Sequence, residues 1–279
     1  MQSGEVQTVK RLHFMSWPQA AKALQCPGST VVWPFGAMEQ HGPQLPLATD
    51  ALFAERILDA VLGELAQDLP IWSLPPQAIG FSPEHRGFPG TVSLSAELLI
   101  GLIKQVGGQL AEQGVKRLVL FNAHGGQIAL LQAAARQCRL RAPQLAVLPC
   151  FLWSGVSGLD QWLSPAELER GLHAGQAETS LMLHLHPELV GDARPRDGDH
   201  GGDTPGSPPE GWSLEGAAPC AWLTSDLSST GVIGDASGAS AEIGAGLEQR
   251  LVQLWRDRFE VLLNSTWPPV NPVPGAPSP

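Results

Sequence analysis

The sequence predicts an α/β fold in which helices cover both faces of a mostly parallel sheet. Two short apolar runs, Thr30–Phe35 and 116–121, have the composition of buried strands. Residues 51–66 and 95–114 instead repeat apolar side chains at spacings of three and four, as a helix lying on a sheet does. Because strands alternate with helices along the chain, we expect parallel strands joined by crossover helices.

Helix caps and turn residues set the expected bounds of these elements. Ser16 precedes Pro18 as at the start of a short helix, and Ser95 and Gly114 flank a longer one. In chain order we expect a short helix from 16, strand 30–35, helix 51–66, a short strand from 70, helix 95–114, strand 116–121, a helix that ends at 141, strand 145–153, a short helix from 164, a helix entered from 173 and a last helix over 238–264. Residues 191–220 are crowded with glycine, proline and aspartate, and predict only a long surface loop that borders the functional site.

Length and composition predict one domain over residues 1–266. A chain of 279 residues suits a single large α/β domain with a substantial core, and no change of composition divides it. Residues 267–279 are rich in proline and cannot build a core, so we expect a disordered or polyproline tail there.

The charge pattern excludes several classes of partner. The net charge is −10, and the 17 lysines and arginines never form a run, which disfavours nucleic acid and anionic membranes. The first residues lack a signal-peptide pattern and no long apolar span follows, so we expect a cytoplasmic protein. Four cysteines lie far apart without a C-x-x-C pair, which predicts free thiols: Cys26, Cys138, Cys150 and Cys220.

Three potential metal ligands follow the first strand within a few residues of one another. Glu39 and His41 are two positions apart, so in an extended segment both side chains leave on the same face. Asp50 lies slightly further on, and glycines and prolines between them predict a loop. A carboxylate, an imidazole and a nearby aspartate suit Zn²⁺, Mn²⁺ or Fe²⁺. The structural alternative is that Thr49 or Asp50 caps the next helix while the other two are solvated loop residues.

A second candidate ligand, His124, follows the strand at 116–121. The order of strand, glycine turn and helix places His124 at the carboxyl end of a strand, as with the first cluster. Open α/β sheets carry their active sites at this edge. A hydrolytic metal centre is therefore our first hypothesis.

Five ordered segments resemble the creatininase (creatinine amidohydrolase) family. They are 36–50 (GAMEQHGPQLPLATD), 84–91 (EHRGFPGT), 122–126 (NAHGG), 173–180 (HAGQAETS), and 231–235 (GVIGD) followed by 239–242 (ASAE). The resemblance implies a three-layer α/β/α sandwich, a pair of divalent metal ions and hydrolysis of a non-peptide C–N bond. It also implies a closed homo-oligomer, a hexamer.

The resemblance also implies a division of the ligands. Glu39, Asp50 and His124 would hold one ion, and His41 would hold the second with Asp50 as the bridge. Two ions about 3.5–4 Å apart can share a carboxylate, activate a bridging water and polarise the scissile carbonyl. A mononuclear site stays open, since the second ion has only His41 and the bridging Asp50 assured.

Further residues match the family's catalytic positions. His173 resembles its acid–base histidine, and a place at the start of a helix predicts an approach opposite the strand-end loops; a structural or capping histidine is the alternative. Glu178 either binds the second metal or orients His173, and otherwise is a helix-terminus charge. Ser82 and His85 either bind substrate or form a locally bonded loop pair.

Departures from the creatinine-hydrolysing members bear on the substrate. Those members carry an aromatic residue and a metal-binding glutamate at the positions of Gly125 and Gly126, and a tryptophan at the position of Glu169. We therefore expect a cyclic amide or formylamide other than creatinine, since the NAHGG form resembles formylamide deformylases of riboflavin and deazaflavin biosynthesis. A catalytically lapsed metal-binding protein and a creatininase-like peptidase are the alternatives.

Overall fold

The computed structural model describes residues 10–200 and 207–269. The proline-rich tail predicted from 267 onward lies outside the described residues from 270. Its first residue, Trp267, is anchored, because its carbonyl oxygen accepts a hydrogen bond from Arg117 Nε at 2.7 Å. In the described part of the chain, no helix is both long enough and apolar enough to cross a membrane.

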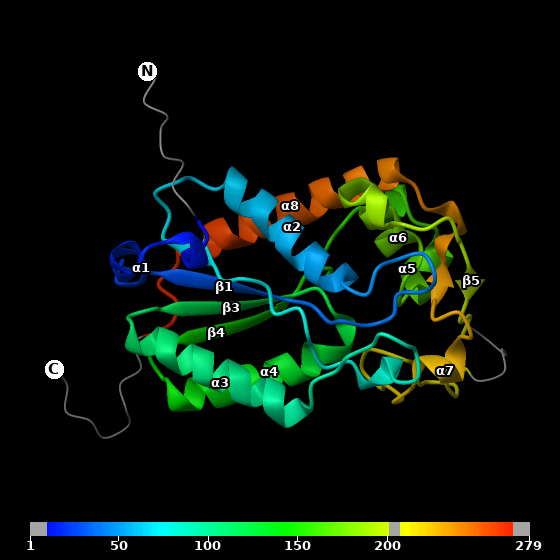
Figure 1. Cartoon of the computed structure of the whole chain (residues 1–279), viewed down its shortest axis with the longest axis horizontal. Helices are drawn as coiled ribbons and strands as arrows, with labels where there is room; N and C mark the ends of the chain where they lie inside the picture. Colours follow the sequence, from blue (N-terminus) through cyan, green and yellow to red (C-terminus); the bar gives the residue numbers. More distant parts are fainter. Residues whose placement is uncertain (1–9, 201–206, 270–279) are drawn as a thin grey trace, which may run out of the picture.

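A four-stranded parallel sheet forms the middle of the molecule, in the order β2–β1–β3–β4 (Figure 1). The strands are β1 (Thr30–Phe35), β2 (Ile71–Ser73), β3 (Arg117–Asn122) and β4 (Ala146–Phe151). In the register, Phe35 pairs with Asn122 and Asn122 with Phe151. Strands β1, β3 and β4 therefore end level with one another, and the loops that follow them share one edge.

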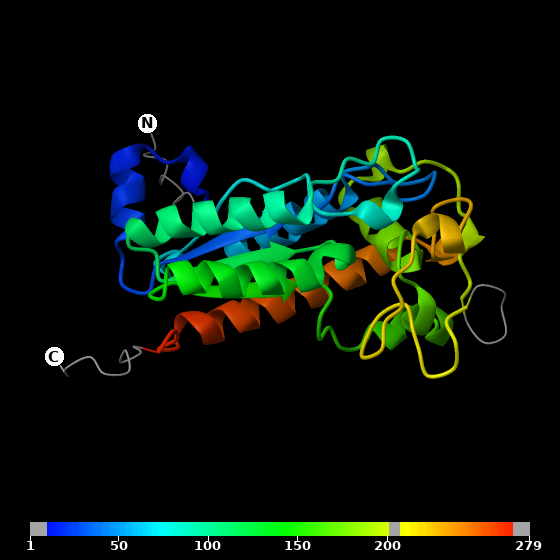
Figure 2. The same ribbon diagram turned by 90° about the horizontal axis from the view of Figure 1, so that it is seen from below.

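Helices cover the two faces of this sheet. One face carries α2 (Thr49–Glu64) and α8 (Ala241–Leu263), and the other carries α3 (Ala96–Glu112) and α4 (Ile128–Arg141), with α1 (Trp17–Leu24) beside the strands' amino ends (Figures 1 and 2). Successive strand residues point to opposite faces, so Val32 and Val119 pack with the first pair of helices and Val31 and Leu118 with the second. The predicted three-layer α/β/α sandwich is confirmed.

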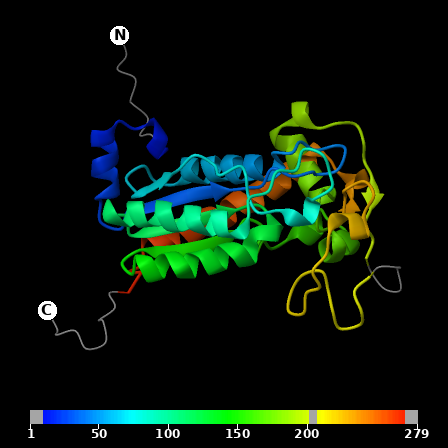
Figure 3. The same cartoon turned by 60° about the horizontal axis from the view of Figure 1, so that its bottom comes forward.

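A smaller group of elements gathers beyond the carboxyl ends of the strands, at the right of Figures 1 and 3. It comprises α5 (Pro165–Arg170), α6 (Gln176–Leu185), α7 (Thr224–Leu227), and an antiparallel pair formed by β5 (Arg196–Asp197) and β6 (Gly234–Asp235). The prediction that 191–220 forms no element was wrong at β5. Two residues carry no periodicity, and β5 exists only because a distant segment pairs with it.

Candidate metal centre

The loop after β1 brings two of the predicted ligands against the first turn of α2. Gly36 permits this approach, because a Cβ there would lie 2.3 Å from the backbone nitrogen of Ala51. Asp50 is the second residue of the helix, whose N-cap residue is Ala48, so neither Thr49 nor Asp50 is the N-cap. Glu39 and His41 are each 1% exposed, so they are not solvated loop residues.

Four predicted ligands converge on one volume; we call Glu39, His41, Asp50 and His124 the ligand cluster. His124 Nδ1 lies 3.2 Å from Glu39 Oε1 and 3.4 Å from Asp50 Oδ2. His41 Nε2 lies 3.4 Å from the other oxygen of Asp50, Oδ1. Asp50 therefore stands between the two imidazoles with one oxygen toward each, the position that a bridging carboxylate requires.

Backbone carbonyls fix the orientation of both imidazoles. His41 Nδ1 donates to the carbonyl oxygen of Glu39 at 3.1 Å, and His124 Nε2 donates to that of Phe81 at 3.0 Å. The other nitrogen of each neutral ring then presents a lone pair to the carboxylates, as a metal-binding histidine does. Asn122 holds the turn before α4, since its Oδ1 accepts the His124 backbone N–H at 3.0 Å.

The ligand cluster shifts the pKa values of its own members. Burial lowers the pKa of the His41 imidazole, but Asp50 and Glu39 outweigh it and raise that pKa to about 9. Burial also lowers the pKa of the His124 imidazole, but Glu39 and Asp50 outweigh this effect and raise that pKa well above its usual value. Such buried carboxylates attract either protons or a cation, so metal binding would release protons.

Unpartnered polar atoms test whether these residues fit a metal ion. Glu39 Oε1 and Oε2, His41 Nε2 and Asp50 Oδ2 are buried and find no hydrogen-bond partner among the residues described. Buried polar atoms are normally satisfied, and an unpaired carboxylate oxygen is costly. Bound divalent cations would satisfy these atoms, so the donor set fits metal binding.

His173 lies just before α6 and packs against the loop that carries the ligand cluster. Its Nε2 donates to the carbonyl oxygen of Gln40 at 2.7 Å, and its Nδ1 lies 3.8 Å from Glu39 Oε1. The ring stacks beside His41, with centroids 4.3 Å apart. His173 thus lies next to the strand-end loop, because it is hydrogen-bonded to the Gln40 carbonyl of that loop. The sequence had suggested a position across the site from the loop. His173 does not cap α6, whose N-cap residue is Gly175.

Glu178 enters the site from the first turn of α6. Its Oε2 accepts the backbone N–H of Ala174 at 2.6 Å, and one of its oxygens lies within 4.8 Å of ligand atoms of His41 and His173. Burial raises the pKa of this carboxyl to about 7 against the opposing effect of His41. No hydrogen bond to His173 occurs in the described structure, so the geometry supports a ligand position more than an orienting one.

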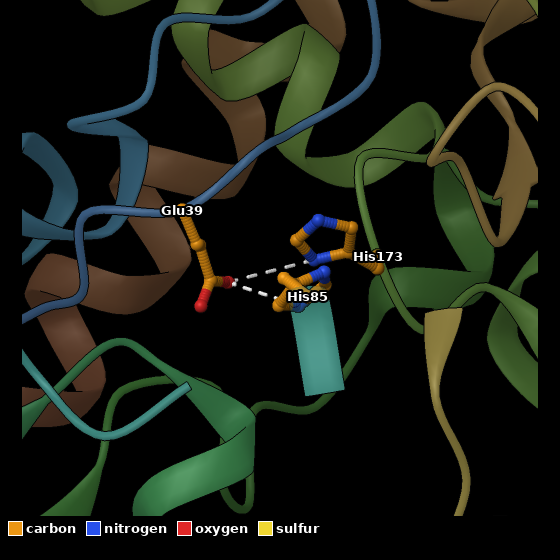
Figure 4. Close-up of side chains that lie close together, drawn as sticks. All are labelled: Glu39, His85 and His173. Atoms are coloured by element: carbon orange, nitrogen blue, oxygen red, sulfur yellow. Dashed lines mark ion pairs between the residues drawn. The ribbon is translucent and has the colours of Figure 1, made fainter. Parts of the chain in front are cut away.

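The loop before α3 supplies His85 and Ser82, the predicted substrate-binding pair. His85 Nε2 lies 3.3 Å from Glu39 Oε1, and Figure 4 shows this ring and that of His173 next to each other, to the right of the Glu39 carboxylate. The His85 ring bonds to Gln40 and Thr224, far away in the chain, whereas its backbone N–H donates to the carbonyl oxygen of Ser82 at 3.4 Å, as a locally bonded loop pair would. Ser82 Oγ is buried without a partner among the described residues and does not line the cavity at the ligand cluster. A substrate role for Ser82 stays a prediction.

The sequence did not single out Glu84 as a site residue. Glu84 Oε1 lies 3.3 Å from His124 Nε2, and a Cβ on Gly126 would lie 1.7 Å from that oxygen. The Glu84 carboxylate therefore occupies the space that any side chain at position 126 would need. The only indication in the sequence is that an acidic residue directly precedes His85 while position 126, where a side chain would need the same space, is a glycine.

A cavity of about 260 Å³ opens over the ligand cluster. Its polar end includes Glu39, Asp50 and His124, with His85 and His173 beside them. Its remaining walls are mostly apolar: Phe151, Trp153, Leu159, Leu163, Leu168, Leu172, Ala177 and Trp222. The exposed Glu215, from the segment predicted to border the site, also lines it. A second hollow of about 390 Å³ lies over β4 and contains no member of the ligand cluster.

Comparisons with known proteins match this fold and site. The creatininase family model, creatinine amidohydrolase, matches residues 13–259. A mycofactocin precursor peptide peptidase of Mycobacterium tuberculosis (strain ATCC 25618 / H37Rv) is 35% identical over 241 residues, which cover 81% of this chain and 83% of that protein. One from Mycobacterium ulcerans (strain Agy99) is 39% identical over 166 residues, covering 58% of this chain and 60% of its own. The creatinine amidohydrolase of Pseudomonas putida is 28% identical over 193 residues, 63% and 72% of the two chains.

Solved structures of similar fold are creatininases. One creatininase structure has a TM-score of 0.76 at 23% identity and covers 92% of this chain and 99% of its own. A manganese creatininase and a mutant of the Zn-Zn type have TM-scores of 0.74 and 0.73. Similarity at this level of identity establishes the shared fold.

Proposed function

Because the chain belongs to the creatininase family and is a creatininase-family hydrolase, we propose that it is a metal-dependent amidohydrolase that cleaves an amide bond of a peptide. One observation carries the proposal: buried, unpartnered carboxylate and imidazole atoms lie at the polar end of a mostly apolar cavity. Identity of 35–39% to precursor-peptide peptidases favours a peptide over the non-peptide amide that the sequence led us to expect.

The ligand cluster would hold two divalent ions, with Asp50 between them. Glu39 and His124 would complete one site, and His41 and Glu178 the other. When bound, such ions activate water near neutral pH and stabilise negative charge on a carbonyl oxygen. The identity of the metal is part of the proposal, with Zn²⁺, Mn²⁺ and Fe²⁺ as the candidates.

His173 is the proposed acid–base group. Its Nε2–H is held by the Gln40 carbonyl, so the lone pair of Nδ1 is directed into the cavity that it lines. Burial lowers the pKa of His173 well below its usual value, and neighbouring His41 and His85 lower it further. The neutral ring can take a proton at Nδ1 from attacking water and return it to the leaving nitrogen.

The cavity limits how much of a substrate can enter. About 260 Å³ lies just below the usual range for ligand sites, roughly 300–1,000 Å³. Only a terminal part of a peptide would fit, and the two tryptophans and four leucines of the walls suit an apolar or aromatic side chain there. The smallness also keeps a compact non-peptide amide as the second candidate, as the Pseudomonas putida relative favours.

A substrate screen on the purified full chain tests the proposal. The protein is loaded separately with Zn²⁺, Mn²⁺ or Fe²⁺ and offered peptides with varied terminal residues, cyclic amides including creatinine, and formylamides. We expect release of a new amine or amino terminus from an apolar-ended peptide, abolished by a chelator and restored by metal. Cleavage confined to small amides would move the function to the second candidate. Full metal loading without any hydrolysis would support the catalytically lapsed protein.

A further inference from the structure

His85, which lines the cavity beside His173, has one ring nitrogen, Nε2, that makes no hydrogen bond to the described residues. His85 is 2% exposed, and its ring stacks on that of His173 with centroids 4.2 Å apart and an interplanar angle of 33°. We call His85 and His173 the histidine pair. Figure 4 shows both rings facing the Glu39 carboxylate. His85 and His173 belong to one group of three possible metal ligands with Glu39, so whether Nε2 of His85 carries a proton decides its role.

The side chain of Gln40 fixes the location of that proton. Its Oε1 accepts the backbone N–H of Gly42 at 2.8 Å, and its Nε2 donates to the carbonyl oxygen of Gly231 at 3.0 Å. Neither backbone group can reverse its role, so the amide cannot be flipped. The Gln40 amide nitrogen therefore donates its second hydrogen to His85 Nδ1, 2.9 Å away. A neutral His85 then carries its proton on Nε2.

Two neighbours support this arrangement. Thr224 Oγ1 lies 2.8 Å from His85 Nδ1, and its hydroxyl can donate to the same lone pair. Gly231 has a φ of +88°, and a Cβ there would lie 1.9 Å from Gln40 Oε1. The glycine thus leaves the room that the Gln40 side chain needs to reach His85.

The same residue sets the opposite tautomer in His173. The backbone carbonyl of Gln40 accepts the Nε2–H of His173, which leaves the lone pair on Nδ1. Gln40 therefore gives the cavity one imidazole that accepts a proton and, stacked on it, one that donates a hydrogen bond. A protonated Nε2 has no lone pair for a metal ion.

We propose that His85 is a substrate-binding donor, whose neutral Nε2–H bonds to the carbonyl oxygen of the scissile amide and to the oxyanion that develops from it. The inference rests on the amide hydrolysis proposed above. Glu39, Asp50 and Glu84 are carboxylates near this position and would repel an oxyanion, whereas a neutral donor stabilises it. No proton leaves His85 in this role.

The tautomer can be tested without turnover. Two-dimensional ¹H–¹⁵N spectra of the zinc-loaded full chain with ¹⁵N-labelled histidine report which ring nitrogen carries the proton. We expect His85, assigned by the signals lost in His85→Gln, to be protonated on Nε2. A proton on Nδ1, or a ¹⁵N shift of Nε2 on Zn²⁺ addition that signals direct coordination, would overturn the proposal.

Variants separate a donor from a ligand and from a structural histidine. His85→Leu removes the N–H, His85→Gln returns an N–H near the position of Nε2, and His184→Gln is the control, since His184 pairs with Glu248 outside the cavity. We expect all three to fold, by circular dichroism, and to bind Zn²⁺ with unchanged stoichiometry. On the substrate from the screen, His85→Leu should lower kcat about 10²–10³-fold with a smaller change in KM, and His85→Gln should recover much of that loss.

Each other outcome has a separate meaning. Loss of zinc in His85→Leu and His85→Gln would make His85 a ligand, and unchanged kcat in His85→Leu would remove it from the reaction; either overturns the proposal. If His85→Leu does not fold, the His85→Gln variant decides. Loss of kcat in folded, zinc-loaded His85→Gln would contradict the donor role. If the wild-type chain cleaves no amide, the proposed function fails, while the tautomer and zinc titration still decide whether His85 presents a fixed donor.

Discussion

The ligand cluster and the histidine pair lie side by side, yet they differ in whether their polar atoms have hydrogen-bond partners. In the ligand cluster, four buried carboxylate and imidazole atoms have no partner among the described residues. In the histidine pair, each ring is fixed through one nitrogen by Gln40. The first arrangement is incomplete without a cation, whereas in the second the hydrogen bonds to Gln40 fix both tautomers without one and leave one nitrogen of each ring facing the cavity. Metal binding and substrate activation are therefore separable, and substitutions can test the separation.

The largest effect is expected at the bridging carboxylate. Asp50→Ala removes both oxygens that face His41 and His124, 3.4 Å away in each case, so neither ion would keep its full set of ligands. We expect bound metal to fall from about two ions per chain to near zero, with loss of activity. Elemental analysis and calorimetric titration with Zn²⁺ measure this. Glu39→Ala, which keeps the bridge, should lose mainly one ion. A wild-type chain that never exceeds one ion would rule out the dinuclear site.

A smaller effect is expected at His173, and only on rate. His173→Ala should leave metal content intact and lower turnover by roughly 10²–10⁴, the usual share of general acid–base catalysis. Its Nδ1 is directed into the cavity but lies 3.8 Å from the nearest oxygen of Glu39. Metal analysis beside steady-state kinetics distinguishes the roles. If the variant loses an ion, His173 is a ligand. If it keeps both ions and full turnover, the proton is carried by another group, and Glu178 becomes the candidate.

The pairing of Glu84 with Gly126 gives a matched comparison within one turn. In Gly126→Ala the new methyl would meet Glu84 Oε1 at 1.7 Å and His124 Nε2 at 2.7 Å, so the carboxylate must move. We expect metal affinity to fall about 10–100-fold, as for other changes behind a ligating histidine. In Gly125→Ala the nearest atom is 3.7 Å away, an ordinary contact, and affinity should stay unchanged. Equal affinities in the two variants would show that Glu84 has no influence on His124.

The parts of this molecule that sequence predicts are those that local patterns specify. Strand β1 has the predicted bounds, the helix predicted to end at 141 does so, and Ser95 accepts the N–H of Leu98 as a cap should. Capping, periodicity and apolar runs need only neighbouring residues. Glu39, His41 and Asp50 were found for the same reason, since they lie in one short stretch.

The rest depends on contacts between distant segments. Gln40 reaches His85 across 45 positions and Gly231 across 191, and no local pattern encodes either hydrogen bond. The place of Glu84 becomes visible only when the space at Gly126 is known. The position of His173 beside His41 likewise follows from one long-range bond to a backbone carbonyl.

The smallest effect we predict concerns the support of Gly231. Asp197 Oδ2 accepts hydrogen bonds from the backbone N–H of Thr230 at 3.0 Å and from the hydroxyl of Ser228 at 2.9 Å, just before Gly231. Burial raises the pKa of this carboxyl, but hydrogen bonds from Thr230 and Gly198 outweigh it and lower the pKa to about 2. A pKa below the unfolded value means that the stabilisation is fully present above about pH 4 and is lost as pH falls toward 2.

Asp197→Asn should remove this pH-dependent contribution and loosen the segment 228–231, which holds Gln40 through the Gly231 carbonyl. We expect the free energy of unfolding of the variant to lie below that of the wild type at pH 6, and the difference to shrink between pH 4 and 2, measured by urea denaturation. Because Gly231 supports Gln40, kcat should fall a few-fold while the zinc stoichiometry stays the same. A difference in unfolding free energy that is constant over this range would show that Asp197 is not the titrating group. A loss of zinc would show that the histidine pair and the ligand cluster are not separable.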